Sequence, residues 1–242
     1  MNGTELAARF SYITNVLRYC GPKEAGEAFI KYVKNKDNKE EVAKAIKKFE
    51  GLYPYLRTIA EATEKDYLDY DVVEAYWIGN ELLDELGDKE VSKAVERLMK
   101  RGLPKSIGEK AIKELPKGFP LHHDFNVMYV GVGNITGSVP VTLQNMENCR
   151  VSWGEVVKVQ KGTLLVRKQP LKFISNEYVL GETETVNAVY LPKMLPDVKK
   201  GDIVALHWGF APIILTREQQ ANLEKYTGRV RAITNEWLKS KR

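Results

Sequence analysis

The stretch Pro116-Lys117-Gly118-Phe119-Pro120 separates two parts of the chain that differ in their apolar pattern. Before it, as in residues 39–50, apolar side chains recur at helical spacing. After it, valine, tyrosine, phenylalanine and glycine alternate in short runs, which is typical of strands. The sequence therefore predicts an α+β protein, with a helical domain at residues 1–118 and a β domain at residues 119–242.

Two sequence signals mark where predicted helices begin. Ser106 with Glu109, and Thr216 with Gln219, fit the capping-box pattern, in which two side chains satisfy free backbone amides reciprocally. The second box opens a last helix that runs toward Trp237. The helices predicted in the first domain cover residues 5–18, 23–34, 39–50, 55–62, 71–86, 92–100 and 106–115.

The β domain is predicted to be a small barrel. Gly162 lies between two alternating runs and fits the turn of a hairpin. Short strands at this spacing favour an OB-like β-barrel over a parallel sheet. The predicted strands cover residues 125–132, 149–160, 163–173, 178–191 and 202–208, and the C-terminal helix follows them.

Composition excludes several classes of protein. Hydrophobic residues make up 43% and charged residues 29% of the 242 residues, which excludes a wholly disordered chain. No apolar run approaches the roughly 20 residues of a membrane span, so no membrane association is expected. The two cysteines and the lack of a secretory signal predict a reducing, cytoplasmic location.

The net charge of +5 is concentrated in a few segments. Residues 92–118 carry eight basic and three acidic side chains, and residues 217–242 carry seven and three. These segments are interpreted as solvated helix faces or as a docking surface for an acidic partner. Neither has basic residues interleaved with aromatic ones, so nucleic-acid binding is not expected.

Two motifs in the β domain carry the most specific signal. The first is Cys149-Arg-Val-Ser-Trp-Gly154-Glu-Val156, and the second is Gly201-Asp-Ile-Val-Ala-Leu-His207-Trp-Gly-Phe-Ala211. Their order and separation resemble the HypC/HupF family of hydrogenase-maturation chaperones over about residues 149–227. The resemblance implies that Cys149 and His207 are ligands of iron.

In that family the iron carries cyanide and carbon monoxide ligands. The chaperone passes it, with a maturation scaffold protein, to the large subunit of a nickel–iron hydrogenase. The resemblance therefore implies these partners and a transient iron cofactor, bare or with such ligands. Thiolate and imidazole suit the role because low-spin iron accepts soft sulfur and nitrogen donors.

The whole chain also resembles an uncharacterised family that is often encoded beside hydrogenase genes. The stretches that carry this resemblance are Tyr19-Cys-Gly-Pro22, Val72-Val-Glu-Ala-Tyr-Trp-Ile-Gly-Asn80, His122-His-Asp-Phe125 and Cys149-Arg150. This family implies no activity, but its gene neighbourhood agrees with the barrel interpretation.

Glu74 is a candidate site residue within the most apolar predicted helix. A buried carboxylate is costly without a partner, so a basic residue, a hydroxyl or a metal is expected beside it. An internal polar contact is the alternative to a functional role. The neighbouring Tyr76 and Trp77 are predicted to belong to the core.

His122, His123 and Cys20 are further candidates. Adjacent residues of an extended segment point to opposite sides, so only one of the two histidines is expected to face Cys149 or His207. Cys20 lies at a predicted helix end, where it is either a second thiol of the same site or a packed residue.

Three functions remain open from the sequence. The first is an accessory protein of hydrogenase maturation that binds and delivers iron through Cys149 and His207. The second is an enzyme that uses Glu74 and a histidine as acid and base in a pocket between the domains. The third is a non-catalytic interaction module that keeps the fold without the iron.

Overall fold

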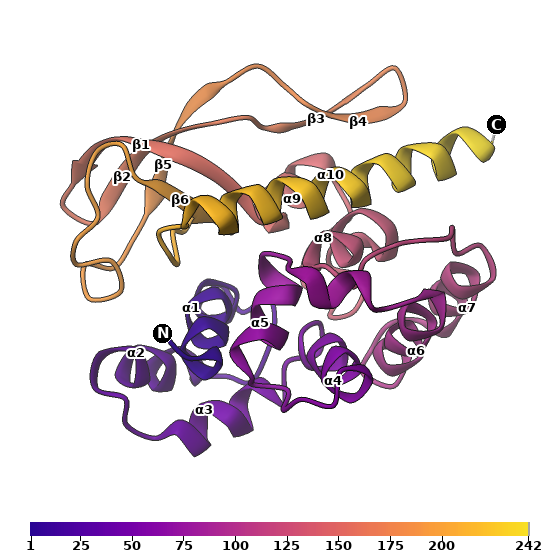
Figure 1. The fold of residues 1–242 in the computed structure, drawn as a ribbon, viewed down its shortest axis with the longest axis horizontal. Coiled ribbons are helices and arrows are strands. Elements are labelled where there is room, and N and C mark those ends of the chain that lie inside the picture. The colour runs from indigo at the N-terminus through magenta and orange to yellow at the C-terminus, as the bar shows by residue number, and fades with distance from the viewer. Residues whose placement is uncertain (242) are drawn as a thin grey trace.

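The computed structural model describes residues 1–241 and confirms the α+β class (Figure 1). The helices are α1 Gly3–Val16, α2 Ala25–Asn35, α3 Lys39–Ile46, α4 Tyr53–Ala62, α5 Tyr70–Trp77, the 3-10 helix η1 Glu81–Asp84, α6 Asp88–Met99, α7 Lys105–Lys113, α8 His123–Phe125, the π-helix η2 Asn126–Gly131, α9 Leu143–Cys149 and α10 Arg217–Ser240. The strands are β1 Ser152–Gln160, β2 Thr163–Lys168, β3 Leu171–Ile174, β4 Glu177–Leu180, β5 Glu184–Val189 and β6 Ile203–Leu206.

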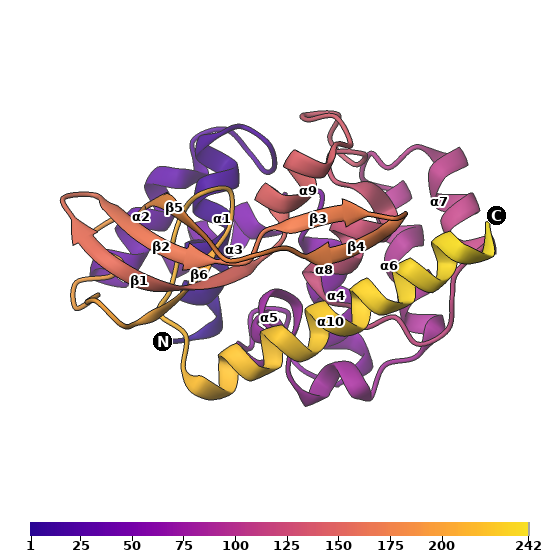
Figure 2. The ribbon, with the colours of Figure 1, turned by 90° about the horizontal axis from the view of Figure 1, so that it is seen from above.

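The strands and the N-terminal helices lie on opposite sides of the molecule (Figure 1). Helix α10 runs along its length, and Figure 2 shows it beside the strands rather than across them. Its most extensive contacts with other elements are with β4, η2 and α8. The chain thus places the connection between its two halves, α8 and η2, beneath the C-terminal helix.

The predicted barrel is not closed, which corrects one detail of the β domain. Four strands form an antiparallel sheet in the order β5-β2-β1-β6, and β3 pairs with β4 as a separate hairpin. The predicted strand at 178–191 is interrupted, and its first part forms β4, which pairs with β3 outside the four-stranded sheet. Within residues 1–241, a single bridge between Val189 and Phe210 joins β5 to the segment after β6.

The predicted strand at 125–132 is wrong, because this segment forms α8 and η2. Every residue from Phe125 to Gly131 is buried. A short run that is apolar on all sides has the same pattern in a central strand and in a buried helix. The tertiary environment therefore decides its conformation here.

Of the two predicted capping boxes, one is confirmed. The Thr216 hydroxyl accepts from the Gln219 amide and the Gln219 side chain accepts from the Thr216 amide, both at 3.1 Å. The box at Ser106 is not formed, because α7 begins at Lys105 directly after Pro104. Pro104 occupies the N-cap position, so Ser106 lies inside the first turn and cannot cap the helix.

The buried apolar side chains form one cluster that includes residues of both halves. Arg9 of α1 also ties the halves together, because its Nη1 donates to the Met194 and Pro212 carbonyl oxygens at 2.6 and 3.2 Å. None of the helices described is both long and apolar enough to cross a lipid bilayer.

Replacing Gly79 with alanine is expected to destabilise the fold by about 2–4 kcal/mol. Gly79 has φ +94°, and a methyl group there would overlap the ring of Tyr226 in α10. Gly201→Ala is the matched control, because Gly201 has φ +91° but open space around it. Urea unfolding should show a clearly larger loss for Gly79→Ala, and equal losses would refute the packing argument.

Candidate metal centre

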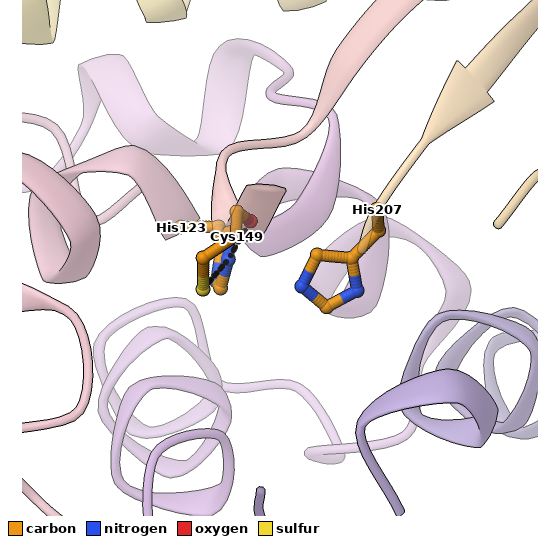
Figure 3. Close-up of side chains that lie close together, drawn as sticks. All are labelled: His123, Cys149 and His207. Atoms are coloured by element: carbon orange, nitrogen blue, oxygen red, sulfur yellow. Dashed lines mark hydrogen bonds between the residues drawn. The ribbon is translucent and has the colours of Figure 1, made fainter. Parts of the chain in front are cut away.

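Three buried side chains with metal-binding atoms converge where the two halves meet. His123 opens α8, Cys149 ends α9, and His207 directly follows β6. One donor atom from each lies within 4.8 Å of the other two. The residues are 5%, 8% and 1% exposed, and Figure 3 shows the imidazole of His207 facing Cys149 and His123.

A tight turn places His207. The backbone N–H and carbonyl of His207 bond with those of Phe210 at 2.9 and 3.0 Å, and both intervening residues have positive φ. Trp208 and Gly209 therefore form a turn of the kind that suits a twisted hairpin. The Trp208 amide donates to the Asn148 carbonyl oxygen at 2.6 Å, which holds this turn against the end of α9.

His207 is oriented as a metal ligand would be. Its Nδ1 lies 3.3 Å from the carbonyl oxygen of Phe10. A carbonyl can only accept, so Nδ1 carries the proton and Nε2 holds a free lone pair. Nε2 is buried and has no hydrogen-bond partner among the described residues. Metal-ligating histidines commonly bond a backbone carbonyl through their other ring nitrogen in this way.

His123 has partners for two tautomers. The Tyr76 hydroxyl lies 2.9 Å from Nδ1 and 3.0 Å from the Gly51 carbonyl oxygen, so it can accept from His123 while donating to Gly51. That arrangement leaves Nε2 unprotonated, 3.6 Å from Cys149 Sγ, and a metal there would have to replace its contact with the Cys149 carbonyl oxygen. With the proton on Nε2 instead, the imidazole would donate to the Cys149 carbonyl oxygen at 2.9 Å. A metal at Nε2 selects the first tautomer.

Burial sets the protonation of all three groups. Desolvation lowers the pKa of His123 to about 4 and that of His207 well below its usual value. Desolvation also raises the pKa of the Cys149 thiol far above its usual value, although a hydrogen bond from Trp208 opposes the change. Both imidazoles are therefore neutral at pH 7, and a metal would displace one proton, from sulfur.

The three side chains lie on a cavity of about 70 Å³. Ser11, Cys20 and Trp77 also line it, together with apolar side chains such as Leu52 and Val139. In the part of the chain described, no Asp, Glu, Lys or Arg lines this cavity. Asp124, next to His123 but outside the cavity lining, is a buried carboxylate whose charge acts on both His123 and Cys149.

The donor set fits a transition metal. With bonds of 2.0–2.1 Å to nitrogen and 2.3 Å to sulfur, donors of a tetrahedral site lie about 3.3–3.6 Å apart. The observed upper limit of 4.8 Å is wider, so the side chains must close slightly around an ion. Three protein ligands leave at least one position open, as in catalytic sites rather than closed structural ones.

The other candidate histidine lies outside this cluster. His122 caps α8, and its Nδ1 accepts from the backbone amide of Asp124 at 3.2 Å. Its ring is fully buried and stacks toward Tyr226, with centroids 6.4 Å apart. Only His123 of the adjacent pair thus faces Cys149 and His207.

Cys20 lies on the wall of the same cavity without joining the cluster. Its thiol donates to the Glu50 carboxylate at 3.5 Å. Burial, and further the Glu50 carboxylate, raise the pKa of Cys20 to about 12. The group of donor atoms within 4.8 Å of one another contains Cys149 and the two histidines, but not Cys20.

Glu74 lies in a different place, on a surface cleft lined by α5, η1 and α10. Its carboxylate accepts from Tyr70 at 3.0 Å, from Gln219 at 2.8 Å and from Asn80 at 3.3 Å. A hydroxyl was one of the expected partners. Glu74 does not line the cavity of Cys149 and the histidines, so the convergence required for the acid–base enzyme is not formed.

Sequence reasoning assigned Tyr76 and Trp77 to the core and did not consider Ser11. All three border the site: Tyr76 bonds His123, and Trp77 packs on both histidine rings with centroids 4.6 and 5.2 Å apart. Tyr76 lies two residues after Glu74, which helical periodicity puts on the opposite face of the helix, whereas Trp77 lies three residues after Glu74, along the same side.

No curated protein and no solved structure matches this chain. A family model does match, and it covers residues 1–241. The chain therefore belongs to DUF6390, a family of unknown function.

Proposed function

We propose that this chain is a cytoplasmic accessory protein of nickel–iron hydrogenase maturation that carries iron. The ion, bare or with cyanide and carbon monoxide ligands, is held by Cys149 and His207, and His123 completes the site. The observation that carries the proposal is the convergence of these three buried donors. It agrees with the pairing that the HypC/HupF resemblance implies.

The chemistry of the donors suits an ion that is carried rather than locked in place. One thiolate and two imidazoles favour a transition metal over calcium or magnesium, which prefer oxygen. The open position would let a partner supply a competing ligand. The partners we propose are a maturation scaffold protein and the hydrogenase large subunit.

The test is anaerobic purification of the full chain with iron(II), followed by metal analysis and infrared spectroscopy. We expect one iron per chain and, when the maturation proteins are co-expressed, bands of cyanide and carbon monoxide. A variant with Cys149→Ala and His207→Ala should lose both signals. Unchanged metal content in this variant would overturn the site assignment, whereas a wild-type chain that binds no iron would overturn the proposal and favour the interaction module.

Tyr76→Phe is expected to weaken iron binding about 10–100-fold, because it removes the partner that holds His123 in the metal-binding tautomer. Competition with a chromophoric chelator measures the change. Tyr129→Phe is the control, since it deletes a similar buried bond, to the Ala111 carbonyl oxygen at 2.9 Å, away from the cavity. Equal affinities for the two variants would contradict the role of Tyr76.

A further inference from the structure

The cavity beside the metal ligands contains polar atoms that the described chain does not satisfy. Ser11 Oγ, Trp77 Nε1 and His207 Nε2 are each buried without a hydrogen-bond partner within residues 1–241. All three residues line this cavity, and Ser11 and Trp77 are 1% and 3% exposed. A metal would satisfy His207, but it cannot bond the indole N–H or the serine O–H donor.

Buried donors normally have acceptors, and leaving one unpaired costs about 1–3 kcal/mol. Trp77 lies against both histidine rings. Ser11 follows Phe10, whose carbonyl oxygen holds His207. Both side chains therefore belong to the wall of the cavity that holds the three ligands, and their donors call for an acceptor.

Charge indicates what kind of acceptor. A divalent ion with one thiolate and two neutral imidazoles keeps one net positive charge. Among the described residues, no carboxylate lines the cavity to neutralise it. An unbalanced charge among buried ligands in a mostly apolar space is unfavourable. A single negative charge on the fourth ligand would remove this cost.

Volume limits the size of that ligand. The cavity of about 70 Å³ corresponds to a few water sites, at roughly 10–15 Å³ for each. It is well below the 300–1,000 Å³ typical of pockets for metabolites. Ligands of one to three heavy atoms fit beside an ion, whereas a nucleotide or an amino acid does not.

We infer that the open metal position takes a small monovalent anion, and that Ser11 and Trp77 are positioning residues that donate hydrogen bonds to it. This inference rests on the proposed metal site and adds the second set of contacts around it. Ser11 and Trp77 belong to the helical half of the chain, outside the motifs of residues 149–227.

Cys20 offers the competing explanation, because a second thiolate would also neutralise the ion. Its thiol is instead directed at Glu50, and its donor atom lies outside the three-residue cluster. Anion binding to the Cys20→Ala variant separates the two explanations. If the fourth ligand is an anion, the Cys20→Ala variant should still bind azide. If Cys20 is the fourth ligand, this variant should bind the metal more weakly.

The experiment uses the full chain loaded anaerobically with cobalt(II), whose visible spectrum reports coordination, and azide as the anion. We expect azide to shift the spectrum in a saturable manner. Ser11→Ala and Trp77→Phe should each retain one cobalt and lose at least tenfold in azide affinity, since hydrogen bonds to charged groups are among the stronger ones.

Matched controls are Trp237→Phe and Ser138→Ala. Trp237 also has a buried indole N–H without a partner in the described chain, but it does not line the cavity. Ser138 lies on the cavity wall, where its hydroxyl is paired with Thr136 at 2.7 Å. Both controls should keep the wild-type azide affinity.

The outcomes distinguish the two proposals. Cobalt binding without any response to azide, or with azide affinities unchanged in both Ser11→Ala and Trp77→Phe, overturns the anion site alone. Failure of the wild-type chain to bind cobalt overturns the metal site itself, before azide is added. Ser11→Ala removes a single oxygen atom, so it keeps the test open if Trp77→Phe folds poorly.

Discussion

Metal-free protein is expected to lose about 4 kcal/mol of its free energy of unfolding for each pH unit between about pH 6 and 5. The cause is that all three histidines of the chain are buried. Desolvation lowers the pKa of His122 to about 3, that of His123 to about 4, and that of His207 well below its usual value.

The sign follows from proton uptake on unfolding. Unfolded histidines take up protons as the pH falls below about 6.5, whereas the folded ones stay neutral. Their contribution is therefore complete above pH 6.5 and is lost as the pH falls toward the folded pKa values. Asp124 acts in the opposite direction at pH values above its unfolded pKa of about 3.9, because burial raises its pKa in the folded protein.

Urea unfolding at several pH values measures this slope, with chelator present throughout. His122→Asn serves as a comparison, since His122 lies outside the metal cluster, and it should reduce the slope by about one third. A typical domain has only about 5–15 kcal/mol of stability, so most of it should be gone near pH 5. Equal stability at pH 7 and pH 5 would contradict the burial of neutral imidazoles.

Cys149→Ala is expected to weaken iron binding by on the order of 100-fold or more. Four-ligand metal sites bind with about 10–16 kcal/mol, which corresponds to about 3 kcal/mol for each ligand. Cys149 also supplies the only negative charge among the three donors. Its loss would leave both charges of the ion unbalanced in an apolar cavity.

Cys20→Ala is the matched control for Cys149→Ala. Both thiols line the same cavity, but Cys20 lies outside the cluster of donor atoms. We expect the control to keep one iron per chain with nearly wild-type affinity, as measured by chelator competition. An equal loss in both variants would place Cys20 among the ligands and change the account of the site.

Local sequence signals predicted the elements that depend on neighbouring residues. Thr216 and Gln219 form their capping box because its four groups lie within one turn. Residues 125–132 could not be assigned in this way, since a segment buried on all sides has no polar face to reveal its period. Barrel closure depends on how the edges of a sheet meet, and no local pattern encodes that.

The candidate site was likewise predictable only in part from the sequence. Cys149 and His207 were paired from two motifs about 50 residues apart, and the structure places both in one cluster. One histidine of the adjacent pair is also expected there, but the sequence does not distinguish His123 from His122. Ser11 and Trp77 reach the cavity through contacts between the two halves, which sequence spacing does not record.

X-ray absorption at the iron edge of the anaerobically loaded full chain tests the metal centre most directly. We expect one sulfur at about 2.3 Å and two imidazole nitrogens at about 2.0–2.1 Å. The sulfur should vanish in Cys149→Ala, and one imidazole should vanish in His207→Ala. Iron surrounded by oxygen alone, or a spectrum that neither substitution changes, would contradict a centre built from His123, Cys149 and His207.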